Sequence, residues 1–429
     1  NAQSTADCPI SDKLKLNAKR EYDEYWKKSG KNVVNTEYGF SISFADQDEL
    51  IKCNRKGMKF HISYDIKWFE KNLDYPTIMK NFSNVFEMFD MCWRSTLVSV
   101  KSQISALEKA FTVKGIRFYQ RGNHFDWIDM ISTAQMTMYY DFLKVHDIDL
   151  EMIFEWFFNE YLPEEFGVVG FSMKASSAAN YVERCRTLAS EMDGVLKQFR
   201  MYVRDGTIDR ELFEISSEHL VIDGIQSFIQ DKYAYPSGRE IQNEMFMLFS
   251  DQSTLSYTSK TQTKYPTLFQ MIKQENILID DFEQYQISDI KWLIERGALR
   301  QNDGGSIELN IQRVGVLKDM YDHDVTCIRY LGGWTDALYE MKSAGDIRIE
   351  NTLFSEPETD YLNYKLNKSE FSDGLDLRNK YVHSTYPQDE YVQRRDYIEL
   401  LKIMVLIITK IYEEFCWWKD RKKVPINEL

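Results

Sequence analysis

An arginine and a histidine stand five positions apart near the end of the chain, in the sequence Arg-Asn-Lys-Tyr-Val-His over residues 378–383. Arg378 carries a permanent planar cation whose N–H groups suit phosphate oxygens. His383 can take up and release a proton near neutral pH. Cleaving an RNA phosphodiester requires both functions, because protons move while negative charge grows on the phosphoryl oxygens. Arg378 and His383 are therefore candidate catalytic residues, and the amide of Asn379 could orient them or bind phosphate.

The spacing of these two residues constrains how they could act together. Five residues of α-helix turn through about 500°, which leaves Arg378 and His383 about 140° apart around the axis. Two copies related by a two-fold axis could bring two arginines and two histidines into one cleft more easily than one chain could. The alternative is structural: Arg378 caps a helix C-terminus and His383 is a hydrogen-bonded turn residue.

The element behind this pair is a long helix predicted over residues 389–418, after a break at Pro387. Its apolar residues recur at alternating spacings of four and three: Tyr397, Leu401, Met404, Ile408, Ile411 and Phe415, with Ile398, Val405 and Tyr412 beside them. Such a wide apolar stripe must bury more than one side of the helix. We therefore expect a homodimer.

This arrangement resembles the HEPN superfamily, through Arg378, Asn379, His383, the small Ser384 and the helix at 389–418. The resemblance covers roughly the last quarter of the chain. It implies an all-helical, usually dimeric bundle, and many members are metal-independent ribonucleases that act as toxins or in antiviral defence. For this chain it implies an endoribonuclease that cleaves RNA at a dimer cleft without a cofactor. The alternative is a non-catalytic helical dimerisation or interaction module, or a winged-helix DNA-binding regulator.

The net charge of −14 over 429 residues argues against a protein that coats nucleic acid, since such binding depends on many cations. A nucleic-acid site must then be a local patch. Residues 377–429 contain ten Lys and Arg against eight Asp and Glu. The candidate RNA-binding residues are Lys380, Arg394, Arg395, Lys419, Arg421, Lys422 and Lys423. A solvated C-terminal tail is the alternative explanation of the last four.

The six cysteines are scattered, and no Cys/His cluster has the spacing of a metal site. We expect no metal or cofactor and a reducing, cytoplasmic location. The N-terminus shows no signal-peptide pattern. The most apolar run, residues 403–408, is far too short to span a membrane. These features predict a soluble protein without a membrane partner.

The rest of the chain is expected to be mainly helical and to contain several domains. Alternating apolar residues at 40–44 and 58–66 predict two strands of a small sheet near the N-terminus. Helical spacing predicts one long helix from Pro76 to about Gly115, and others at 126–145, 148–162, 175–203, 237–249, 314–341 with a break at Gly332, and 356–366. Pro163 should halt the helix at 148–162. Ser237 with Glu240 forms a capping-box pattern for the helix at 237–249.

Residues 250–265 have the composition of a linker. Two short helices follow at 268–272 and 288–296, with Gly297 as a C-cap, and then a hairpin of 298–301 with 306–310. This order is similar to a winged helix-turn-helix. Its charges are balanced, so a structural or protein-binding wing is favoured over a reader of DNA sequence. The predicted domains are a mainly helical region (1–255), a winged-helix-like module (266–312) and a HEPN-like bundle (313–429). A regulatory protein or nucleic acid could bind the first region or the wing.

Overall fold

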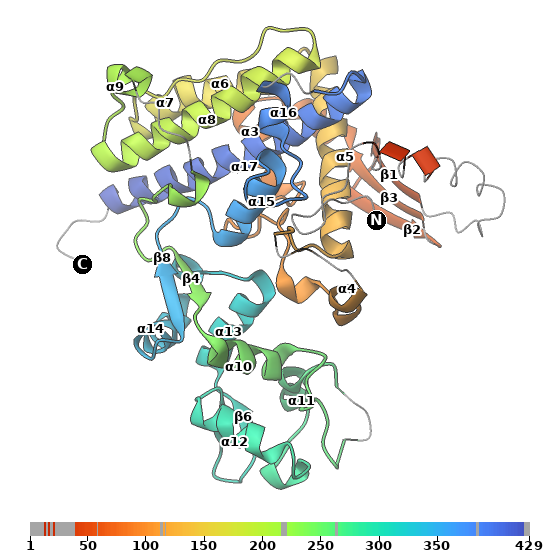
Figure 1. Cartoon of the computed structure of the whole chain (residues 1–429), viewed down its shortest axis with the longest axis vertical. Coiled ribbons are helices and arrows are strands. Elements are labelled where there is room, and N and C mark those ends of the chain that lie inside the picture. The colour runs from red at the N-terminus through yellow and green to blue at the C-terminus, as the bar shows by residue number, and fades with distance from the viewer. Residues whose placement is uncertain are drawn as a thin grey trace. The chain divides into compact units, whose positions relative to one another are not determined.

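The computed structural model describes residues 13, 16–17, 20–21, 39–57, 59–111, 115, 117–215, 221–261, 265–382 and 386–423. The chain divides into two compact units, Asn1–Asp74 with Lys114–Arg117, and Tyr75–Val113 with Phe118–Leu429. Helices predominate in the described residues and each sheet has two or three strands, so the prediction of a mainly α fold is confirmed (Figure 1). None of the described helices has the length and apolar character needed to cross a membrane.

The first unit contains a three-stranded sheet in the order β1-β3-β2. Its strands are β1 (Gly39–Ala45), β2 (Ile51–Lys56) and β3 (Lys59–Asp65), with β1 parallel and β2 antiparallel to β3. The two predicted strands are confirmed, while β2 was missed because its charged sequence does not alternate. Helix α2 (Ile66–Lys71) follows β3 directly, because the Asp65 carboxylate accepts hydrogen bonds from the backbone N–H groups of Lys67 and Trp68.

The second unit is built around the long helix α17 (Glu390–Lys423), which confirms the predicted C-terminal helix. Helices α5 (Asn123–Val145), α8 (Tyr181–Asp205) and α15 (Glu356–Leu366) surround it (Figure 1). All three were predicted, although α8 begins at Tyr181 and not at the predicted residue 175. Each side chain of α17 from Asp396 to Phe415 is buried, except for the half-buried Tyr412.

This burial corrects one argument for a dimer. The wide apolar stripe was expected to need a second copy of the chain, but helices of the same chain cover it. α17 is a central helix rather than an interface helix. A homodimer stays a prediction that must rest on the other argument, the angle between Arg378 and His383.

The prediction of one helix from Pro76 to about Gly115 is wrong. Helix α3 (Tyr75–Asn84) ends early, and the chain then runs irregularly to the short helices η1 (Lys101–Gln103) and α4 (Ala106–Phe111). Glu87 and Trp93 in this irregular segment have positive φ angles of 52° and 61°. Most of its apolar side chains, Phe86, Phe89 and Leu97 among them, are buried although they are not on a helix, so tertiary packing overrode the helical spacing.

The prediction that Pro163 halts a helix is also wrong. Helix α6 (Leu150–Trp156) continues as a π-helix, η2 (Phe157–Tyr161), and then as α7 (Leu162–Phe166). Pro163 lies in the first turn of α7, where its missing N–H is tolerated. α7 ends at Gly167, whose φ of 68° suits a glycine.

The segment that resembles a winged helix has the predicted order of elements, α11 (Leu268–Gln274), α12 (Ile287–Glu295) and a hairpin of β5 (Leu299–Gln301) with β6 (Ile307–Leu309). Gly297 follows α12 with a φ of 79°, as expected of a C-cap glycine. These elements share one hydrophobic core with α10 (Arg239–Phe249) and α13 (Ile311–His323).

The expected linker is packed against this core in its described part, since Leu255 and Ser256 are buried. Residues 262–264 of it lie outside the described residues. The expected capping box is wrong, because the N-cap of α10 is Gly238.

A second three-stranded sheet was missed. Its strands are β4 (Tyr233–Pro236), β7 (Thr326–Cys327) and β8 (Ile347–Glu350), and β4 pairs antiparallel with both others. Strands of two to four residues leave no readable alternation in a sequence. The remaining elements are α9 (Arg210–Ile215), η3 (Ile222–Gly224), η4 (Ile279–Asp281), η5 (Ile328–Tyr330), η6 (Gly332–Trp334), α14 (Thr335–Ser343) and α16 (Leu377–Val382).

Candidate functional site

The Arg-Asn part of the motif lies on the short helix α16, directly before α17. A tight turn at Gly374 brings the chain back against the end of α15. The Leu375 N–H donates to the Tyr364 carbonyl at 2.8 Å, and a Cβ at Gly374 would lie 2.6 Å from the Asn367 carbonyl oxygen. Only glycine fits such a close approach. The turn fixes where α16 begins.

Arg378 forms an ion pair with Asp193 on α8. The two side chains keep 30% and 22% of their surface exposed, respectively. Arg378 therefore joins two helices. It does not cap a helix C-terminus, so that part of the structural alternative is wrong. Beside Arg378, exposed Asn379 donates from Nδ2 to the Asp376 carboxylate at 2.8 Å. A phosphate at this surface would meet a guanidinium already paired with one carboxylate, and would have to compete with it.

His383 lies in 383–385, outside the described residues, and its relation to Arg378 stays a prediction. The residues on both sides of this segment are held by Arg186 of α8. Its Nε donates to the Tyr381 carbonyl at 2.8 Å, and its guanidinium carbon lies 5.4 Å from the centre of the Tyr386 ring. The rings of Tyr381 and Tyr386 stack with centroids 6.2 Å apart. Sequence reasoning missed Arg186, since it is 195 residues from Tyr381 and no local pattern marks it.

The described candidate RNA-binding cations all have acidic partners. Lys380 pairs with Asp396 at 2.8 Å, and Arg395 lies 3.9 Å from the same carboxylate. The other ion pairs are Arg394 with Asp141 and Lys419 with Glu165. The side chains of Arg421, Lys422 and Lys423 lie outside the described residues. These carboxylates offset much of the positive charge that the sequence indicated.

The candidate cations do not form one local patch, so that expectation is wrong. Arg394 and Lys419 are both on α17, and at 1.5 Å of rise per residue their backbones are separated by about 37 Å. Lys380 and Arg395 share the Asp396 partner near the start of α17, at the end where α16 lies. Lys419–Lys423 are therefore at the far end of α17 from the motif.

Buried charges on α17 form a cluster that the sequence did not reveal. The Lys365 ammonium of α15 lies 2.8 Å from Glu399 and 2.8 Å from Asp129 of α5. Lys402 lies 3.0 Å from Asp129 and 3.3 Å from Glu399. Burial alone would raise the pKa of Glu399, but the two lysines outweigh it and lower that pKa. The cluster fixes α17 against α5 and α15.

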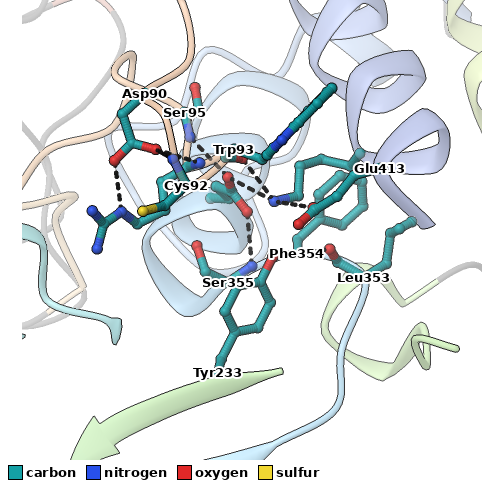
Figure 2. Close-up of polar contacts among 12 residues, drawn as sticks. Asp90, Cys92, Trp93, Ser95, Tyr233, Leu353, Phe354, Ser355 and Glu413 are labelled. Carbon is teal, nitrogen blue, oxygen red and sulfur yellow. Dashed lines mark hydrogen bonds and ion pairs between the residues drawn. The ribbon is translucent and has the colours of Figure 1, made fainter. Parts of the chain in front are cut away.

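A second buried cluster surrounds Lys410 of α17, and Figure 2 labels Trp93, Ser95, Ser355 and Glu413 in it. The Lys410 ammonium donates to the Trp93 carbonyl at 3.0 Å and lies 3.4 Å from the Glu358 carboxylate. Glu358 also accepts hydrogen bonds from the backbone N–H groups of Ser95 and Ser355, both at 2.9 Å. Burial opposes the charge on Lys410, but its acidic neighbours raise its pKa overall. This cluster anchors the irregular segment at 85–100 to α15 and α17.

Among the described residues, no group of three or more His, Cys, Asp and Glu side chains could hold a metal ion. Comparisons of the chain with protein-family models, with characterised proteins and with solved structures found no match.

Proposed function

We propose that this chain is a metal-independent endoribonuclease of HEPN type that acts in the cytoplasm as a toxin or an antiviral-defence effector. The observation that supports this best is the setting of Arg378 and Asn379. They lie partly or fully exposed on a short helix directly before the buried helix α17. Arg186 holds the chain on both sides of the segment that contains His383. A site of this kind needs an accessible cation beside a proton-transfer group.

In the proposed mechanism, Arg378 binds the phosphoryl oxygens of RNA and stabilises the charge that develops there. Asp193 holds the guanidinium in the free protein and is displaced by the phosphate. His383 transfers the protons to and from the reacting oxygens, and Asn379 orients its neighbours or binds phosphate. Two copies of the chain would supply two Arg378 and two His383 side chains to one cleft.

The alternative function is a non-catalytic helical interaction module, in which the winged-helix-like segment binds a protein or DNA. The ion pair of Arg378 with Asp193 favours it, because that contact explains the arginine without any substrate. The two functions differ in what His383 does.

The test is single-turnover cleavage of a fluorescent RNA by His383→Ala. The rate should fall by about 10²–10⁴ because general acid–base catalysis contributes about that much. RNA affinity should scarcely change. Arg378→Lys should rescue little, because an ammonium lacks the planar pair of donors. Circular dichroism and light scattering must match the parent, since a misfolded variant would imitate a catalytic one. Cleavage by His383→Ala at the parental rate would favour the interaction module.

A further inference from the structure

A cavity of about 380 Å³ lies in the second unit between α3, the irregular segment after it, the π-helix and α17. Its walls are mainly apolar and include six aromatic residues: Phe89, Trp93, Trp156, Phe157, Tyr161 and Tyr412. None of the residues in the proposed ribonuclease site lines it. The volume is near the lower end of the range of about 300–1,000 Å³ for small-molecule sites. It suits a compact ligand or the terminal unit of a polymer rather than a longer stretch of polymer chain.

The π-helix η2 builds one wall of this cavity. Trp156 precedes the π-helical turn and Tyr161 ends it, and their ring centroids are 5.0 Å apart. The Tyr75 ring contacts Trp156 as well, with ring centroids 5.5 Å apart. A π-helical turn inside an α-helix is rare and frequently occurs at a functional site. Here it accompanies two aromatic residues that line the same cavity.

Trp93 forms another wall and is held in an unfavourable backbone conformation. Its φ of 61° is rare for a bulky residue and persists only where the surroundings enforce it. The Lys410 ammonium supplies that restraint by donating to the Trp93 carbonyl (Figure 2). The Trp93 ring lies 5.7 Å from the Tyr412 ring of α17. The buried charge cluster thus fixes an aromatic wall of the cavity.

The charges at the cavity indicate the class of ligand. Aromatic walls suit either an organic cation or a planar ring. Among the described lining residues Asp90 is the only acidic one, and its carboxylate accepts from Arg94 Nε at 2.7 Å and from the Cys92 N–H at 2.8 Å. Lys80 is exposed and has no ion-pair partner among the described residues. A cation would meet no free carboxylate, whereas an anion would meet Lys80.

We propose that this cavity binds a nucleoside monophosphate, with its planar base between the aromatic side chains and its phosphate at Lys80. Stacking on aromatic rings accepts any base, because every base has a π face. Ser83, Asn84 and Thr409 line the same cavity and supply hydrogen-bonding groups for the edge of the base or the sugar. The ligand is either a free mononucleotide or the 5′-terminal nucleotide of a strand. The proposal does not depend on the ribonuclease assignment.

The test is isothermal titration of the full chain with AMP, GMP, CMP and UMP. Adenosine lacks the phosphate and ribose 5-phosphate lacks the base, so both should bind more weakly than AMP. Trp156→Leu should weaken AMP binding by about 5- to 150-fold because it removes a stacking ring, while Trp156→Phe should retain part of the affinity. Lys80→Ala should weaken it up to about fivefold, as expected of an exposed charge. Lys291→Ala, at an exposed lysine of α12, is the matched control and should leave binding unchanged.

Competition distinguishes the two sources of the ligand. A deoxytetranucleotide has no 2′-hydroxyl and cannot be cleaved by attack of one. If its 5′-phosphorylated form displaces AMP and its 5′-hydroxyl form does not, the ligand is the end of a strand. If neither form displaces AMP, the ligand is a free nucleotide. Ribose 5-phosphate binding as tightly as AMP, parental affinity in Trp156→Leu, or no binding of any mononucleotide at millimolar concentration would overturn the proposal.

Discussion

Arg378 on α16 and Asp193 on α8 form an ion pair whose two members both keep part of their surface exposed. The exposure means that a phosphate can approach the guanidinium without unfolding either helix. The pairing means that the charge of Arg378 is partly neutralised until the phosphate arrives. Asp193 would then be a built-in competitor of the RNA backbone.

Removing this competitor should strengthen RNA binding. In Asp193→Asn the guanidinium is free to neutralise one phosphate more completely, so the slope of log affinity against log salt should steepen by up to about 0.7 for single strands. The free energy of unfolding should fall by at most about 1 kcal/mol, since a partly exposed pair contributes little. Titrations at several salt concentrations and urea unfolding measure the two effects. Asp205→Asn on the same helix is the control, and an unchanged slope in Asp193→Asn would argue that Arg378 does not contact phosphate.

Cleavage should not need a divalent metal ion. Arg378 supplies the positive charge at the phosphate and His383 the proton transfers, so the proposed site leaves no step that requires one. We expect cleavage to persist in excess chelator and to leave 2′,3′-cyclic phosphate ends, which mass spectrometry of the products identifies. Activity that disappears in chelator and returns with magnesium would contradict this mechanism.

The fold could be predicted where one long pattern decides the structure. α5, α8, α15 and α17 each carry a sustained helical spacing, and all four appeared where they were expected. The segment at 85–100 carried the same spacing but folded irregularly, because Lys410 and Glu358 hold its backbone from other elements. Contacts of that kind are not encoded in local spacing.

For the candidate site, the sequence could predict only the residues of the short motif itself. The motif identified Arg378 and Asn379, but their setting depends on Asp193 and Arg186, which α8 brings from a distant part of the chain. The sequence predicted that Lys419 and the Arg378 motif belong to one positively charged patch. In the structure most of the length of α17 lies between Lys419 and the motif. A local sequence cannot show which cations have acidic partners or how far apart a helix holds them.

The protein should be a dimer in solution. The reason is the angle between Arg378 and His383, which two copies related by a two-fold axis can reconcile. Multi-angle light scattering at micromolar concentration should give twice the chain mass of 50.9 kDa. Because α17 is already buried within one chain, dilution to monomers should leave the circular dichroism spectrum unchanged. A monomer at every concentration would count against a shared cleft.

Gly374→Ala should displace α16, which carries Arg378 and Asn379, although neither of these residues is mutated. The added Cβ would lie 2.6 Å from the Asn367 carbonyl oxygen and 3.0 Å from that of Phe371, so the turn before α16 must shift. Overpacking of this kind costs about 1–3 kcal/mol, measurable by urea unfolding. RNA cleavage should fall as well, because α16 carries Arg378. Gly333→Ala is the control, since a Cβ there meets open space. Equal free energies of unfolding for the two variants would show that the turn at Gly374 accommodates the added Cβ without loss of stability.

Glu399→Gln should destabilise the protein and change how its stability depends on pH. Lys365 and Lys402 would stay buried with only Asp129 as an acidic partner, and breaking a buried ion pair costs about 3–5 kcal/mol. The lysines lower the pKa of Glu399 in the folded protein below its ordinary value of 4.5. Its stabilising contribution is therefore present above about pH 4.5 and is lost as the pH falls towards the folded pKa.

Urea unfolding of the parent and of Glu399→Gln across pH 3–8 measures this contribution. The difference in free energy of unfolding between them should be largest near neutral pH and should shrink as the pH falls below about 4.5. Glu165→Gln is the control, because its partner Lys419 is partly exposed at the surface, so its curve should follow that of the parent. Two curves for the parent and Glu399→Gln that run parallel down to pH 3 would mean that Glu399 is not held as a carboxylate by the two lysines.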